Sequence, residues 1–310
     1  MKLISIVSQC YNEEGNVREI YAKVKEIMGA FPGYRYEYIF IDNHSQDQTP
    51  AILREMARND RNVKVILNTR NFGQIRSPIH AMLQAKGDAV ISIVSDLQEP
   101  PSMIADFIKK WEEGYKLVVG VKNQSEESPL VYVLRSLYYH FVERLSDIKL
   151  ANNITGFGLY DREVIELLRK IDDPYPYLRG LICDLGYERA EIPYTQPKRK
   201  RGRTKNNFFT LYDYAMLGIT NHSKIPLRLA AMLGFILSVL NLLAALGYFV
   251  YKLLFWERFS LGLAPVVIGL FFFASVQLFF LGVIGEYIGS IYTHIKKRPL
   301  VVEKERINFD

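Results

Sequence analysis

The chain has 310 residues and a formal net charge of +6, and 49% of its residues are hydrophobic. This length accommodates one α/β domain of about 200 residues and a further apolar segment. Nucleic acid is disfavoured as a partner because the basic excess lies beside two long apolar runs, where anionic lipid headgroups and substrate phosphate are better counterparts. The two cysteines, Cys10 and Cys183, are typical of a reducing compartment that needs no disulfide.

Short apolar runs alternate with amphipathic segments through the first part of the chain. The pattern predicts strands at 2–8, 36–41, 63–67, 89–94 and 115–121, and helices at 17–28, from 50 onward, at 77–84 and at 102–113. Strands that alternate with helices indicate a mostly parallel sheet, and such sheets bind ligands beyond the carboxyl ends of their strands. We therefore expect a cytosolic α/β domain over residues 1–206.

Two long apolar runs follow, from Ile225 to Phe255 and from Leu261 to Ile284. Each is long enough to cross a hydrocarbon core of about 30 Å at about 1.5 Å per residue. The sequence therefore predicts transmembrane helices at about 227–254 and 261–284, within a hairpin over residues 225–293. The alternative is a buried helical hairpin in a soluble protein, which would need another layer of protein to cover it.

The charges that flank the two runs predict how the hairpin is oriented. Basic residues stand before the first run and after the second: Lys198, Arg199, Lys200, Arg201, Arg203, Lys205, Lys224 and Arg228, then Lys296, Lys297 and Arg298. The positive-inside rule predicts that both basic flanks, and therefore the tail at 294–310, lie in the cytosol. The N-terminal sequence does not resemble a signal peptide, so the N-terminal domain is expected in the cytosol as well. Residues 207–224 are predicted to form an interfacial amphipathic helix, with an ordinary core helix as the alternative.

Polar clusters follow three of the predicted strands, at Tyr11–Glu14, Asp42–Asp47 and Ser95–Pro101. An acidic residue in such a place is often only a helix N-cap, and Asp161 is interpreted in that way. Three acidic clusters on one rim instead suit a hard divalent cation, with Asp96 as the best ligand. The glycine patterns of dinucleotide and P-loop sites are absent, and the histidines lack the paired spacing of a zinc site.

Taken together, the motifs resemble family 2 glycosyltransferases of the polyprenyl-phosphate branch. The segments that carry the resemblance are YNEE (11–14), IFIDNHSQDQT (39–49), RNFG (70–73), SDLQEPP (95–101), GFGLYDR (156–162), RGRTK (201–205) and the closing GEYIGSIYTHIKKRPL. The resemblance implies a GT-A, Rossmann-like nucleotide-sugar domain with a mostly parallel sheet, followed by an interfacial helix and a two-helix transmembrane hairpin. It implies an inverting enzyme that moves a sugar from a nucleotide diphosphate, UDP-glucose or a related UDP-hexose, to polyprenyl (undecaprenyl) phosphate at the cytosolic face of the inner membrane.

The resemblance also implies roles for single residues. Nucleotide binding would involve Gln9, Tyr11, Glu13, Asp42, Ser95, Arg199 and Lys205. Asp96 would be the catalytic carboxylate and, with Gln98, would hold Mg²⁺ or Mn²⁺ against the donor diphosphate. Lys122 and Arg135 would bind the acceptor phosphate. A homo-oligomer, such as a tetramer, is implied as well.

The chain departs from the family pattern at four positions. Val94, Asn43 and Gly156 stand where relatives carry Asp, and Gln9 stands where they carry Pro. Fewer carboxylates weaken a metal site unless the substrate diphosphate supplies the negative charge. Two other functions stay open: a non-catalytic membrane adaptor that binds nucleotide sugar, and a processive polysaccharide synthase, a class that usually has more spans and a QxxRW motif.

Overall fold

The computed structural model describes residues 1–124, 154–197, 212–213, 216–218, 220, 223–255 and 263–309. Its centre is an eight-stranded sheet in the order β7-β5-β6-β4-β1-β2-β3-β8. The strands are β1 (Lys2–Cys10), β2 (Tyr34–Asp42), β3 (Val63–Asn68), β4 (Ala89–Ser92), β5 (Leu117–Gln124), β6 (Ile154–Asp161), β7 (Arg189–Thr195) and β8 (Glu303–Ile307). The helices are α1 (Val17–Gly29), α2 (Thr49–Asn59), α3 (Gly73–Gln84), α4 (Met103–Glu112), α6 (Arg162–Ile171), α7 (Leu178–Asp184), α9 (Ile225–Leu254) and α10 (Leu263–Ile295).

The sheet is mostly parallel, as the alternation of strands and helices predicted. β1 pairs in parallel with β2 and β4, β2 with β3, and β5 with β7. The exceptions are β6, which is antiparallel to both β4 and β5, and β8, which is antiparallel to β3. The five predicted strands are confirmed, whereas β6, β7 and β8 were not predicted.

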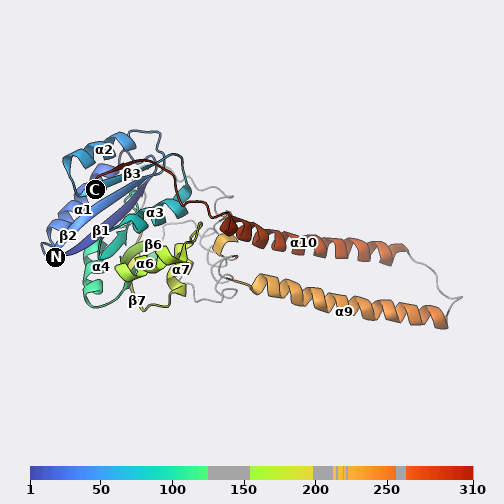
Figure 1. Ribbon diagram of the computed structural model, residues 1–310. Coiled ribbons are helices and arrows are strands. Elements are labelled where there is room, and N and C mark those ends of the chain that lie inside the picture. Colours follow the sequence, from blue (N-terminus) through green and yellow to red (C-terminus); the bar gives the residue numbers. More distant parts are fainter. Residues whose placement is uncertain are drawn as a thin grey trace.

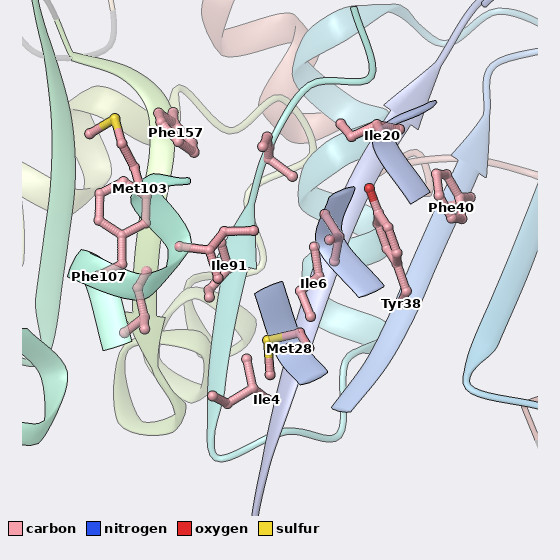
Figure 2. Close-up of a cluster of buried hydrophobic side chains, with 14 of the residues drawn as sticks. Ile4, Ile6, Ile20, Met28, Tyr38, Phe40, Ile91, Met103, Phe107 and Phe157 are labelled. Carbon is pink, nitrogen blue, oxygen red and sulfur yellow. The ribbon is translucent and has the colours of Figure 1, made fainter. Parts of the chain in front are cut away.

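Helices pack on both faces of the sheet, which explains why the central strands β1 and β2 are almost continuously buried. Alternate residues enter opposite cores: Ile4, Ile6, Tyr38 and Phe40 lie on one face, and Val7, Ile39 and Ile41 on the other. On the first face, α1 buries Val17, Ile20, Val24 and Met28, the spacing of one helical stripe. Figure 2 shows Ile20 and Met28 of α1 beside the side chains of β1 and β2.

The end of the chain returns to the domain after α10. β8 pairs with β3, with Val65 opposite Ile307 and Leu67 opposite Glu305, so residues that were predicted only as a cytosolic tail form an edge of the sheet. Arg54 on α2 binds the Glu305 carboxylate through Nε and Nη2, at 3.0 and 2.7 Å from Oε2. Asn308 Nδ2 donates to the carbonyls of Ala57 and Val63. Both termini therefore lie in the same domain (Figure 1).

The helices α9 and α10 extend away from this domain on the same side (Figure 1). Their membrane-length segments, Ile225–Tyr251 and Ile268–Ile295, are exposed, and Phe235 and Leu278 are each 71% exposed. No described element covers these apolar surfaces, as a buried hairpin would require, and a continuous apolar surface of this size is unfavourable in water. The two helices indicate association with a membrane.

The second membrane helix is longer than the sequence predicted. It continues from the expected end at Ile284 to Ile295, because Glu286 and the polar residues after it do not stop a helix, and the first strong breaker is Pro299. The predicted interfacial helix at 207–224 lies mostly outside the described residues, although 212–213, 216–218 and 220 are helical.

Candidate active site

The loops that follow β4, β1 and β2 lie side by side at the carboxyl edge of the sheet, because these three strands are neighbours. Each loop contains one residue in the left-handed region: Leu97 at φ 61°, Asn12 at φ 55° and His44 at φ 66°. Residues other than glycine adopt this conformation only where their surroundings enforce it, and such positions concentrate at functional sites. The three predicted polar clusters therefore form one candidate site.

The loops after β1 and β2 are joined by hydrogen bonds that run in both directions. Asn12 N donates to Ser45 Oγ at 2.8 Å, and Gln46 N donates to Asn12 Oδ1 at 2.8 Å. Glu13 N donates to Thr49 Oγ1 at 2.9 Å. These bonds hold the loop after β1, with the half-buried Gln9, Tyr11 and Glu13, against the residues that follow Asp42. The two joined loops are called the frame below.

Asp42 is the most buried carboxylate of the predicted nucleotide-binding set, at 2% exposure. Its oxygens accept hydrogen bonds from Ser45 N at 3.0 Å and Ser45 Oγ at 2.5 Å. Burial raises the pKa of Asp42, and the negative charge of Asp47 adds to the rise, while the Ser45 bonds oppose it. Donor groups of a ligand, such as ribose hydroxyls or a base N–H, would relieve the cost of burying this acceptor.

The loop after β4 places Asp96 beside this frame. Ser95 Oγ donates to the carbonyl of Gln9 at 2.7 Å and lies 3.0 Å from Cys10 Sγ, so the hydroxyl of Ser95 ties β4 to the end of β1. Asp96 Oδ1 accepts Gln98 N at 3.1 Å, which closes a tight turn. Asp96 and Gln98 are half-buried at the edge of the site.

Glu99 lies in the SDLQEPP segment, and its sequence context did not predict a role for it. It is 5% exposed, and it accepts hydrogen bonds from Val94 N at 2.9 Å and from Thr155 Oγ1 at 3.0 Å. Burial raises its pKa to about 8, despite these bonds, so the side chain is mainly neutral at pH 7. Glu99 links both ends of the Asp96 loop to β6, and no local pattern in the sequence signals that contact.

The structure explains two of the positions at which the chain departs from the family pattern, Asn43 and Gly156. Asn43 Oδ1 accepts from Phe72 N at 2.8 Å and Ser77 Oγ at 2.9 Å, while its Nδ2 donates to Asn71 Oδ1 at 2.9 Å. An ionised Asp could not make that last donation. Gly156 has φ +96°, so Asp could not stand there without strain.

Of the other predicted residues, the structure describes some and not others. Because β6 is antiparallel to both β4 and β5, β5 runs parallel to β4, and Lys122 near its end lies at the same carboxyl edge, beyond β6. Arg135, Arg199 and Lys205 lie outside the described residues. Asp161 is confirmed as an N-cap, since its side chain accepts Glu163 N at 2.9 Å; it also accepts Trp111 Nε1 at 2.7 Å.

A divalent cation at Asp96 would find few other protein ligands. Within the part of the chain that the structure describes, no three His, Cys, Asp or Glu side chains converge as a metal site. One carboxylate and the amide of Gln98 do not form a cage, but Mg²⁺ is commonly held by one or two carboxylates together with phosphate oxygens and water. The donor set therefore fits a cation that arrives with a diphosphate.

The comparisons with known proteins define the class. A family model described as glycosyl transferase family 2 matches residues 5–169, more than half of the chain. The chain belongs to this family and is a glycosyltransferase. Its mostly parallel sheet has the predicted GT-A architecture, and the two exposed apolar helices that follow are consistent with the predicted hairpin.

The similarity to known proteins extends over nearly the whole chain. Bactoprenol glucosyl transferase of Shigella phage SfII is 31% identical over 303 residues, covering 97% of this chain and 97% of that protein. Putative glycosyltransferase CsbB of Bacillus subtilis (strain 168) is 33% identical over 303 residues, covering 98% and 92%. Among solved structures, glucosyl-3-phosphoglycerate synthase from Mycobacterium tuberculosis in complex with UDP aligns with a TM-score of 0.49 at 18% identity, covering 71% of this chain and 78% of that one.

Proposed function

We propose that this glycosyltransferase moves a hexose from UDP-glucose or a related UDP-hexose to undecaprenyl phosphate, with inversion at the anomeric carbon. The observation that carries the proposal is the similarity to bactoprenol glucosyl transferase over 97% of both chains, a length that includes both membrane helices. A lipid acceptor gives those helices a function, because the soluble donor and the embedded prenyl chain must meet at the level of the headgroups.

The acceptor needs little activation in this reaction. A phosphate monoester has a second pKa of about 6, so undecaprenyl phosphate is largely a dianion at neutral pH and attacks without a general base. The enzyme must instead hold two anions in line and stabilise the departing diphosphate. We assign Lys122 and Arg135 to the acceptor phosphate.

On the donor side, the frame of Gln9, Tyr11, Glu13 and Asp42 would bind the base and ribose, with Ser95 holding the loop after β4 against it. Asp96 and Gln98 would position the diphosphate, and Arg199 and Lys205 would close over it. A bound Mg²⁺ or Mn²⁺ would neutralise negative charge on the leaving diphosphate.

We place the catalytic domain and both termini in the cytosol and the hairpin in the inner membrane. Support comes from Lys296, Lys297 and Arg298, which directly follow the second apolar helix. In this arrangement residues 1–206 form the transferase domain, 207–224 lie at the interface, 225–293 span the membrane and 294–310 return to the cytosol. A homo-oligomer remains part of the proposal.

The test is an assay in detergent with undecaprenyl phosphate and labelled UDP-sugars, with and without Mg²⁺ or Mn²⁺. The expected result is a metal-dependent, butanol-extractable product whose formation falls by roughly 10²–10³-fold in Asp96→Ala, the usual scale for losing one electrostatic contact to a transition state. Asp106→Ala removes an exposed carboxylate from the first turn of α4 and serves as the matched control.

Two results would contradict the proposal. Binding of UDP-sugar without any lipid product would favour the adaptor function, and a long polymer would favour a processive synthase.

A further inference from the structure

Two arginines from the loop after β3 and from α3 stack on the same aromatic ring. The guanidinium carbon of Arg70 lies 4.0 Å from the centroid of Phe72, and that of Arg76 lies 5.3 Å from it. Arg76 Nη2 also donates to the carbonyl of Pro299, in the segment that leaves α10. The neighbouring residue, Arg298, is exposed and close enough to repel Arg76. Arg70, Arg76 and Arg298 are called the arginine cluster below.

The arginine cluster is not neutralised by the described part of the protein. None of its members forms an ion pair with a carboxylate of a described residue, and Arg76 Nε is buried without a hydrogen-bond partner among those residues. Burial, together with the charges of Arg70 and Arg298, lowers the pKa of Arg76. A partly buried guanidinium beside like charges is unfavourable unless an anion completes it.

A small cavity adjoins the arginine cluster through Arg298. It has a volume of about 200 Å³, and its walls include the apolar side chains of Ile79, Leu83 and Leu181 with the basic Lys297 and Arg298 at the segment after α10. Asp172 and Asp173 also lie on its wall; Asp173 lies 3.3 Å from His294. An apolar floor beside a basic rim matches a molecule whose phosphate adjoins an apolar part.

The position of the arginine cluster selects the source of that phosphate. The second membrane helix ends at Ile295, so Arg298 stands directly after it, at headgroup depth if the helix spans a bilayer. Figure 1 shows α3 at the side of the domain that faces the hairpin, next to the segment that leaves α10. We propose that Arg70, Arg76 and Arg298 bind the phosphate of an anionic phospholipid headgroup at the membrane surface.

This binding site does not depend on the sugar-transfer reaction, so it is tested without UDP-sugar. Full-length protein in detergent is mixed with equal concentrations of dioctanoyl phosphatidylglycerol and dioctanoyl phosphatidylcholine, and native mass spectrometry counts the two adducts. We expect a preference for phosphatidylglycerol that falls about fivefold for each arginine changed to Gln, the scale of one basic residue near an anionic surface. Arg298→Gln is the decisive variant because the Arg298 side chain is exposed, so its substitution should not disturb folding.

Two further variants control the measurement. Arg58→Gln removes an exposed arginine from the last turn of α2, near Glu305 and outside the arginine cluster, and should keep the preference. Arg76→Lys keeps the charge and should retain more of the preference than Arg76→Gln.

Three outcomes would overturn the proposal. The first is a wild type without any preference for phosphatidylglycerol. The second is an Arg298→Gln variant that keeps the preference in full. In a parallel arm, undecaprenyl phosphate alone would give an arginine-dependent adduct, which would assign the arginine cluster to the acceptor and not to a phospholipid.

Discussion

At the scale of single residues, two buried carboxyl groups in the domain are stabilised in opposite ways. Glu37 accepts hydrogen bonds from Ser5 Oγ at 2.5 Å and Lys86 N at 2.7 Å, and it pairs with Lys64 Nζ at 2.5 Å. Burial favours the neutral acid, but these bonds outweigh it and lower the pKa of Glu37 below its ordinary value. Glu99, which lacks a cationic partner among the described residues, is held neutral instead.

Changing Glu37 to Gln should destabilise the domain because it leaves Lys64 half-buried and unpaired. The free energy of unfolding is expected to fall by about 3–5 kcal/mol at neutral pH, the usual scale when one partner of a buried ion pair is removed. The folded pKa of Glu37 lies below the unfolded one, so its contribution is present above the unfolded pKa of about 4.3 and disappears as pH falls through the folded pKa.

Thermal unfolding of wild type and Glu37→Gln at pH 7 and near pH 4 tests this prediction. The difference in Tm should narrow at the lower pH. Glu55→Gln breaks an exposed pair with Arg18 and should change Tm far less than Glu37→Gln does at pH 7, because solvent screens an exposed pair. A gap between wild type and Glu37→Gln that is independent of pH would show that the charge of Glu37 is not what stabilises the domain.

Glu99 should act on catalysis by holding the Asp96 loop, as a positioning residue. Glu99→Gln keeps an acceptor for Val94 N and a donor for the Thr155 hydroxyl, so transfer should continue at nearly the wild-type rate. Glu99→Ala removes both bonds, and displacement of Asp96 by about 1 Å could lower the rate by up to about 10²-fold.

The measurement is the transfer rate against Mg²⁺ concentration. Positioning predicts that Glu99→Ala needs more Mg²⁺ for half-maximal rate, while Glu99→Gln does not. Equal loss in both variants would instead indicate that the carboxyl group itself takes part in the reaction.

At the scale of elements, β8 decides how the sheet ends. It covers the outer edge of β3, which would otherwise present unpaired N–H and C=O groups. It also carries Glu303, whose Oε1 lies 2.6 Å from His80 Nε2 on α3. The strand therefore connects the segment after the membrane hairpin to α2, through Arg54, and to α3.

Removing residues 300–310 should destabilise the domain far more than removing one ion pair of β8. The deletion exposes the edge of β3 and should lower Tm and promote aggregation, whereas Glu305→Gln loses a partly exposed bridge worth about 1 kcal/mol or less. Size-exclusion chromatography and thermal unfolding of both proteins in detergent make the comparison. A deletion that remains monodisperse with an unchanged Tm would show that β8 contributes no stability.

At the scale of the whole molecule, the orientation that we propose for the hairpin in the membrane can be tested with thiols. Cys10 is buried, and burial raises the pKa of its thiol, so a Cys183→Ser background should not react with an impermeant maleimide. In that background, Glu257→Cys between the helices should be labelled in right-side-out spheroplasts. Lys304→Cys, exposed on β8, should be labelled only in inverted vesicles. The reverse pattern would place the domain outside the cytosol.

Local patterns in the sequence determined much of this protein: the first five strands and the helices between them, the Asp161 cap, the two membrane helices, and the three polar loops at one edge of the sheet. Each depends on residues within a few positions of one another, where periodicity and capping act. The insertion of β6 between β4 and β5, the pairing of β8 with β3, the burial of Glu99 and the arginine cluster were decided only by the tertiary structure. They join segments far apart in the chain, and which strand edge or buried charge meets which partner depends on packing that no local pattern records.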